Sequence, residues 1–355
     1  MSRITGAERG MRSGRLSRRV TLMGGAIMLT GALLLPGNAL RAAETGSNSQ
    51  IAEIRVQSVS FKNNDISLAG NVYYPKGFDE SRKYAAVVVI HPGGGVKEQA
   101  AGLYAQKLAA EGFVTLAFDA SHQGASGGMP RFVDDPMKRV VDIYSAVDYL
   151  TSLPYVDAER IGALGVCAGS GITVKASMTE RRIKAVATVS AVDVGAATRK
   201  GWDGKGSEAE LLATLDAVAK QRTAEAGGAA PVYVNYVPKL GDTTAPRDLQ
   251  QAADYYLTPR GQHPNSTNQM LMTSISTLAS FTGFAGAETL LTQPLLIVAG
   301  SNAGSLWHSQ ELNAKAASKA KELIIIDGAT HMDLYDGQGA DVAAKKIAPF
   351  FQHNL

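Results

Sequence analysis

The chain has 355 residues, enough for one large hydrophobic core or for a core with an inserted segment. Its hydrophobic content of 45% and charged content of 19% are ordinary for a globular protein and exclude extensive disorder. The net charge of +3 is local: residues 1–42 hold seven Arg and one Glu, so the remainder carries −3. The folded part therefore has no basic excess with which to bind a nucleic acid.

The basic N-terminal segment has the pattern of an export signal. Arg18-Arg19 is a twin arginine, an apolar run over 22–35 follows it, and the small pair at 42–43 suits a signal peptidase. We predict a twin-arginine signal peptide over 1–43, with the twin-arginine translocase as export partner and the periplasm as destination. An N-terminal membrane anchor is the alternative, disfavoured because a span needs about 20 apolar residues.

Beyond the leader, predicted strands and helices alternate. The strands, in chain order, cover 57–61, 66–74, 85–90, 113–118, 160–166, 183–191, 295–299 and 323–326. The helices between and after them cover 97–111, 136–153, 169–178, 208–221, 268–278, 309–321 and 342–351. This alternation predicts a mostly parallel sheet with helices on both faces, which is an α/β fold, entered through an antiparallel hairpin.

The alternation is interrupted between 195 and 292, where Gly, Thr, Gln and Asn are frequent. A segment of that length is too long for a loop in a compact domain. We therefore predict a core formed by 51–194 and 293–355, with 195–292 inserted as a cap. The cap is expected over the carboxyl edge of the sheet, where ligands bind in sheets of this type.

Gly165-Val166-Cys167-Ala168-Gly169 has the pattern of a nucleophile elbow with Cys in place of the usual Ser. The turn from strand to helix brings the residues two before and two after the nucleophile together, so both must be small. Cys167 meets this requirement, and Ser170 does not, because Ile172 follows it. The start of a helix is expected to favour the thiolate. The alternative is that Cys167, the only cysteine, is a small buried side chain.

A glycine-rich stretch, His91-Pro92-Gly93-Gly94-Gly95, follows the predicted strand 85–90. In a fold with a nucleophile elbow this position supplies half of the oxyanion hole. Pro92 has no N–H, so the N–H of Gly93 is expected to act with that of Ala168. A tight turn with positive φ is an alternative role for these glycines, and both can hold.

His331 is the predicted base among six histidines, because it follows the last predicted strand. The others lie in the tail, in the cap segment, at a strand end and in two loops: His353, His263, His91, His122 and His308. The group that orients the base is less defined, since 300–305 contains no carboxylate where an acid is usual. Asn302 is preferred on chain order, and Asp193, after the strand 183–191, is the other candidate.

Together these residues resemble the dienelactone hydrolase-like α/β-hydrolases, over 84–200 and 290–350. The resemblance extends to a largely uncharacterised bacterial branch that is similar to fungal polyketide transferases and thiohydrolases. It is carried by His91–Glu98, by the elbow around Cys167, and most specifically by Asp254-Tyr255-Tyr256-Leu257-Thr258-Pro259-Arg260-Gly261. The resemblance implies an α/β-hydrolase fold with a cysteine, histidine and acid; the missing acid near 302–304 departs from it.

The predicted activity is hydrolysis of a small ester, lactone or thioester, or acyl transfer from one. His331 would deprotonate Cys167, and Gly93 and Ala168 would hold the oxyanion. No metal or organic cofactor is implied, since the sequence has no HExxH, no CxxC pair and no phosphate-cradling loop. The alternative from another class is a non-catalytic exported binding protein on a hydrolase scaffold, and a serine-type peptidase is disfavoured by the cysteine itself.

Overall fold

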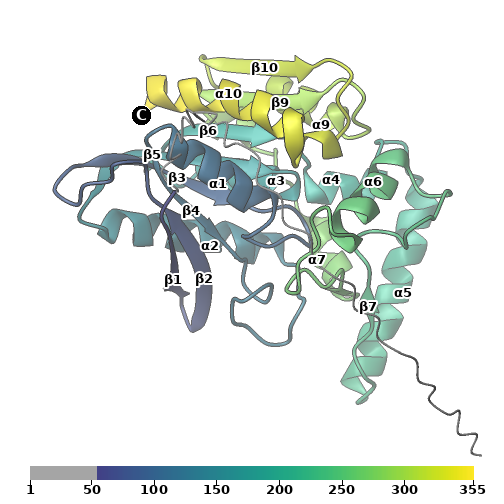
Figure 1. Ribbon diagram of the computed structural model, residues 1–355. Helices are drawn as coiled ribbons and strands as arrows, with labels where there is room; N and C mark the ends of the chain where they lie inside the picture. The colour runs from purple at the N-terminus through teal and green to yellow at the C-terminus, as the bar shows by residue number, and fades with distance from the viewer. Residues whose placement is uncertain (1–53) are drawn as a thin grey trace, which may run out of the picture. The chain divides into compact units, whose positions relative to one another are not determined.

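The computed structural model describes residues 54–355, and the predicted export signal lies outside them. Among the described residues, none of the helices combines the length and the apolar character needed to cross a membrane. Eight strands form one sheet in the order β1-β2-β4-β3-β5-β6-β9-β10 (Figure 1). They are β1 Val56–Asn63, β2 Ile66–Tyr73, β3 Tyr84–Ile90, β4 Val114–Phe118, β5 Val156–Val166, β6 Ile183–Val189, β9 Leu295–Gly300 and β10 Lys321–Ile326.

The sheet is parallel from β4 to β10, and β2 is the one strand of the sheet that runs against the others. β1 pairs antiparallel with β2, and β2 antiparallel with β4, while all remaining neighbours are parallel. In parallel strands the carboxyl ends meet at one edge. The segments that follow β3, β5, β6, β9 and β10 therefore converge there.

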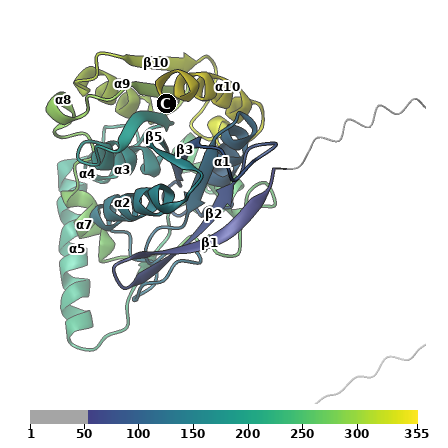
Figure 2. The same cartoon turned by 90° about the vertical axis from the view of Figure 1, so that its left-hand side faces the viewer.

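Helices cover both faces of the sheet, as Figures 1 and 2 show. On one face Val88 and Ile90 pack with α2 (Pro136–Ser152), α3 (Ala168–Ser177) and α9 (Leu306–Lys315). On the other face Val87 and Val89 pack with α1 (Ala100–Ala110) and α10 (Gly337–Asn354). Because β3 is covered on both sides, all seven of its residues are buried, which explains its continuous apolar sequence. The predicted α/β-hydrolase fold is confirmed.

The long segment between β6 and β9 contains, within the described chain, five helices and a small two-stranded antiparallel sheet. They are α4 Val194–Lys200, α5 Glu208–Ala226, β7 Tyr233–Val234, α6 Arg247–Leu257, β8 Met270–Leu271, α7 Ser274–Ser280 and α8 Ala287–Leu290. Helix α5 stands at the edge of the molecule in both views, and Val218 is its one buried residue (Figures 1 and 2). By contrast, α6 turns both its tyrosines inward.

Two predicted helices differ from the structure. The helix expected over 309–321 ends at Lys315, because the chain must turn and reach the start of β10 at Lys321. The helix expected over 268–278 is instead the short strand β8 followed by α7. The helix α6 had no counterpart among the predicted elements, although Pro246 at its start and Asp248 in its first turn are ordinary start signals.

Candidate active site

Cys167 lies at a strained turn between β5 and α3. Its φ is +54° and its ψ −121°, a conformation that side chains rarely adopt outside such elbows. A Cβ placed on Gly165 would lie 2.5 Å from the carbonyl oxygen of Gly169, and one on Gly169 would lie 2.4 Å from that of Ile90. The two glycines therefore allow the turn, as the sequence spacing predicts.

Gly93 and Ala168 lie side by side at Cys167, since a Cβ placed on Gly93 would be 3.5 Å from that of Ala168 and all three residues line one cavity. The backbone N–H groups of both residues act to lower the pKa of the Cys167 thiol. Gly93 comes from the loop after β3, and Ala168 is the first residue of α3. Two N–H groups that approach one side chain from separate elements can stabilise negative charge that develops beside it.

The protonation state of the thiol differs from the sequence-based expectation. Burial raises the pKa of Cys167, and this exceeds the lowering by hydrogen bonds from Tyr335, Ala168 and Gly93. The expected thiolate was therefore wrong for the resting site: the start of α3 does favour the anion, but desolvation outweighs it. Cys167 is half-buried as a residue and lines a cavity.

His331 follows β10 and is 1% exposed, with its ring held on three sides. Its Nδ1 lies 2.6 Å from the hydroxyl of Ser305, and its Nε2 lies 3.3 Å from the hydroxyl of Tyr335. The indole of Trp202 packs edge-on against the imidazole at 4.8 Å. Burial lowers the pKa of His331 to about 4, so the imidazole is neutral at pH 7.

Neither residue expected to orient His331 hydrogen-bonds to it. Asn302 is exposed, and its amide donates to the carbonyl oxygen of Gly328. Asp193 caps α4, with its carboxylate accepting the N–H groups of Gly195, Ala196 and Gly283. The orienting contact comes instead from Ser305, three residues beyond Asn302, because α9 begins there and turns this hydroxyl toward the ring.

We expect Ser305→Ala to lower kcat/KM on an activated ester about 10- to 100-fold, because a buried Nδ1–H loses its acceptor. The imidazole can then move its proton to Nε2, where the base needs a lone pair. Asn302→Ala is the matched control and should stay close to wild type, since its amide is exposed. Steady-state kcat/KM is measured for both variants. A loss of activity confined to Asn302→Ala would instead indicate that Asn302 orients His331.

Two further residues at His331 were missed by the sequence analysis. The Tyr335 hydroxyl lies at Nε2 of His331 and acts to lower the pKa of the Cys167 thiol, so it lies near both residues. Asp248 of α6 accepts hydrogen bonds from the indole of Trp202 at 2.9 Å and from the N–H of Gly304 at 2.7 Å. Its charge raises the pKa of His331 against the effect of burial, so a carboxylate acts on the base from the inserted segment.

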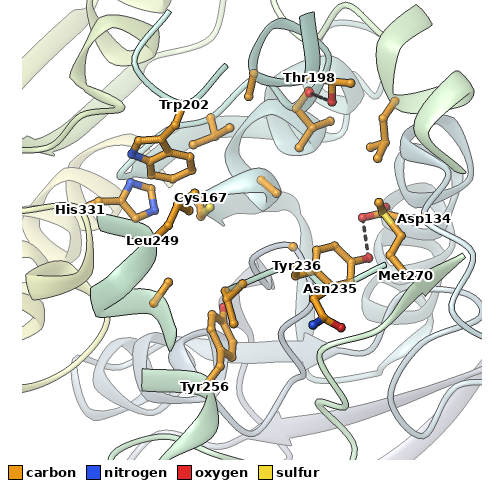
Figure 3. Close-up of a pocket in the computed structure, with 18 of the residues that line it drawn as sticks. Asp134, Cys167, Thr198, Trp202, Asn235, Tyr236, Leu249, Tyr256, Met270 and His331 are labelled. Carbon is orange, nitrogen blue, oxygen red and sulfur yellow. Dashed lines mark hydrogen bonds between the residues drawn. The ribbon is translucent and has the colours of Figure 1, made fainter. Parts of the chain in front are cut away.

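A cavity of about 300 Å³ lies at Cys167 and His331 (Figure 3). The sheet and its loops supply one part of the lining, and the inserted segment supplies the rest, including Trp202, Tyr236 and Tyr256. Most of the lining is apolar. Such a cavity suits a ligand with a hydrophobic body and strengthens electrostatic interactions at the nucleophile.

The stretch Asp254–Gly261 connects this segment to both halves of the site. Arg260 forms two hydrogen bonds of 2.8 Å with the carboxylate of Asp336, just beyond His331. The carbonyl oxygen of Gly261 accepts a hydrogen bond of 2.6 Å from Gln99, whose own amide oxygen accepts the N–H of Val96. The predicted oxyanion loop, which runs from His91 to Lys97 after β3, and the loop that carries His331 and Asp336 are therefore both held by one short segment.

The remaining histidines have other surroundings. His91 is buried at the start of the loop after β3, where its Nε2 accepts the N–H of Ala120. His308 is buried and stacked on Trp307, and His122 hydrogen-bonds to the carbonyl oxygen of Pro130. None of the three lines the cavity at Cys167.

The sheet order, the elbow and the histidine after the last strand define an α/β-hydrolase. Residues 68–201 match the model of the dienelactone hydrolase family. The chain belongs to the dienelactone hydrolase-like α/β-hydrolases, and is a hydrolase-type enzyme.

Three relatives illustrate the family. The uncharacterized protein YcjY of Escherichia coli (strain K12) is 45% identical over 301 residues, which cover 84% of this chain and 98% of that one. The crystal structure of the hypothetical protein PA2218 from Pseudomonas aeruginosa is 36% identical with a TM-score of 0.80, covering 86% of this chain and 95% of that one. The polyketide transferase claH of Penicillium crustosum is 23% identical over 306 residues, or 84% and 97% of the two chains.

Proposed function

We propose that the protein cleaves small esters, lactones or thioesters through a covalent acyl-enzyme on Cys167. The observation that carries this proposal is geometric: Cys167 has the backbone conformation of an elbow and lines one cavity with Gly93, Ala168, Tyr335 and the buried His331. A non-catalytic binding protein, the alternative, would have no use for a strained backbone at Cys167.

In the first half-reaction, Nε2 of His331 accepts the thiol proton while Sγ of Cys167 attacks the carbonyl carbon. The carbonyl oxygen becomes an oxyanion, which accepts hydrogen bonds from the N–H groups of Gly93 and Ala168. When the intermediate collapses, His331 returns its proton to the leaving alcohol or thiol, and the acyl group remains on sulfur. Ser305 accepts from Nδ1–H and keeps the Nε2 lone pair directed at the nucleophile.

In the second half-reaction, a water molecule loses its proton to His331 and attacks the acyl-thioester. The acid is released, and the proton returns to Cys167. An alcohol or amine in place of water would give acyl transfer. The similarity to a fungal polyketide transferase and the mostly apolar cavity favour acyl transfer as the second candidate activity.

The pH dependence distinguishes this general-base mechanism from one that starts with a thiolate–imidazolium pair. His331 is competent as a base when neutral, so kcat/KM should be constant from about pH 6 to 8. It should fall at lower pH toward half its value near the pKa of about 4. The measurement is kcat/KM for a panel of p-nitrophenyl esters and thioesters, with folding followed by circular dichroism.

A profile that rises and falls around neutral pH would instead indicate the ion pair. Absence of turnover throughout the panel would favour the binding protein.

A further inference from the structure

The cavity at Cys167 has polar groups at a second position, away from His331 (Figure 3). There the hydroxyl of Tyr236 donates a hydrogen bond of 2.8 Å to Oδ2 of Asp134. Asp134 immediately precedes the N-cap of α2, and Tyr236 follows β7 of the inserted segment. Most of the remaining lining is apolar, with Val192, Val194, Ala197, Met270 and Leu278 among its residues, and it also includes Thr198 and Asn235.

Asp134 is 3% exposed, so its carboxylate requires compensation. Tyr236 satisfies Oδ2, and Gln123 in turn approaches the tyrosine hydroxyl at 3.3 Å. Oδ1 has Nη1 of the buried Arg139 at 3.8 Å and accepts no hydrogen bond from any residue between 54 and 355. One carboxylate oxygen at the cavity thus lacks a donor, while the charge itself is balanced by Arg139.

A carboxylate only accepts hydrogen bonds, so the missing partner must be a donor. Because Arg139 already balances the charge, a neutral donor suits the position better than an ammonium group. A hydroxyl group is the neutral donor that an acyl chain commonly carries. A purely aliphatic chain would exclude water from Oδ1 without replacing its hydrogen bonds, which is a recognised basis for rejecting such a chain.

We propose that the enzyme selects acyl groups that bear a hydroxyl remote from the reacting carbonyl, recognised by Asp134 and oriented with the help of Tyr236. This inference rests on the proposed function, since it assigns the acyl part of the same substrate. It makes Asp134 a residue that determines specificity and takes no part in bond cleavage.

The test compares three p-nitrophenyl esters of matched length, with a terminal hydroxyl, methoxy or methyl group, in butanoate, hexanoate and octanoate series. At the length that fits, wild type should prefer the hydroxyl ester at least about 10-fold in kcat/KM over both others. The methoxy ester is the informative probe, because its oxygen accepts hydrogen bonds but donates none.

Asp134→Asn keeps the shape and offers an N–H donor, so the hydroxyl and methoxy esters should become equivalent. Tyr236→Phe should weaken the preference without removing it. Thr198→Val is the matched control: Thr198 also lines the cavity, but its hydroxyl donates to the carbonyl oxygen of Val194, so the preference should persist.

Equal rates for all three esters in wild type, with turnover that depends on Cys167, would overturn the hydroxyl proposal alone. An undiminished preference in Asp134→Asn would also overturn it. Failure to hydrolyse any of the esters would overturn the proposed function and this inference with it.

Discussion

Cys167→Ala is expected to lower kcat/KM on the best ester or thioester by at least about 10³-fold. The reason is that, in the proposed mechanism, Cys167 supplies the atom that forms the acyl bond. The rate that remains in Cys167→Ala should reflect only substrate binding in the cavity and stabilisation of the oxyanion by the backbone N–H groups. Steady-state kinetics with the variant at high concentration measure it.

Two controls accompany this variant. Cys167→Ser keeps a nucleophile and should retain more activity than Cys167→Ala, because neutral His331 can deprotonate a hydroxyl as in serine hydrolases. Ser170→Ala tests the serine rival: its hydroxyl donates to the carbonyl oxygen of Gly165 and is 0% exposed, so activity should change little. Wild-type rates in Cys167→Ala would refute a cysteine mechanism.

Asp119→Ala is expected to lower the free energy of unfolding by about 3–5 kcal/mol, because it removes a buried carboxylate that pairs with Lys97 and accepts two backbone N–H groups. Among the described residues, Lys97 would keep only Glu98, at 2.6 Å, as an ion-pair partner. Asp119 is 0% exposed, and its carboxylate lies 3.0 Å from the ammonium group of Lys97. It also accepts the N–H groups of Lys97 at 2.7 Å and Ala125 at 2.8 Å. Since Lys97 ends the oxyanion loop, activity should fall as well.

The measurement is denaturant unfolding of wild type and variant. Asp341→Ala is the matched control, because its ion pair with Lys107 is exposed and should contribute little. Asp119→Asn keeps the shape of the side chain, so its free energy of unfolding should lie between those of wild type and Asp119→Ala. This variant replaces Asp119→Ala in the comparison if Asp119→Ala does not fold. Equal stability of Asp119→Ala and the Asp341 control would contradict the role assigned to the buried pair.

The sequence predicts those features that depend on neighbouring residues. The elbow at Cys167 follows from Gly165 and Gly169, because a turn that tight admits no side chain at either position. The strand β3 follows from its apolar run, since a strand covered on both faces needs no alternation. The position of His331 follows from chain order within an alternating fold.

The contacts of His331 depend on segments far apart in the chain, and so the sequence does not specify them. Ser305 contacts the imidazole of His331 and Asn302 does not, because the start of α9 determines which side chain faces that ring. Asp248 acts from α6, in a segment without recognisable alternation. The contact between Tyr335 and His331 could have been predicted from their spacing, because residues four apart in a helical turn lie on the same face. Desolvation of the thiol could not be anticipated without the cavity.

The central claim is that an acyl group passes through Cys167, and trapping that acyl group tests it most directly. A slowly hydrolysed p-nitrophenyl ester, mixed with the enzyme and quenched in acid, should raise the intact mass by one acyl group, which peptide mapping should place on Cys167. Cys167→Ala should show no such increase, and Ser305→Ala should acylate more slowly than wild type. Acylation of another residue in wild type, or turnover with a full burst of p-nitrophenol in Cys167→Ala, would contradict the account.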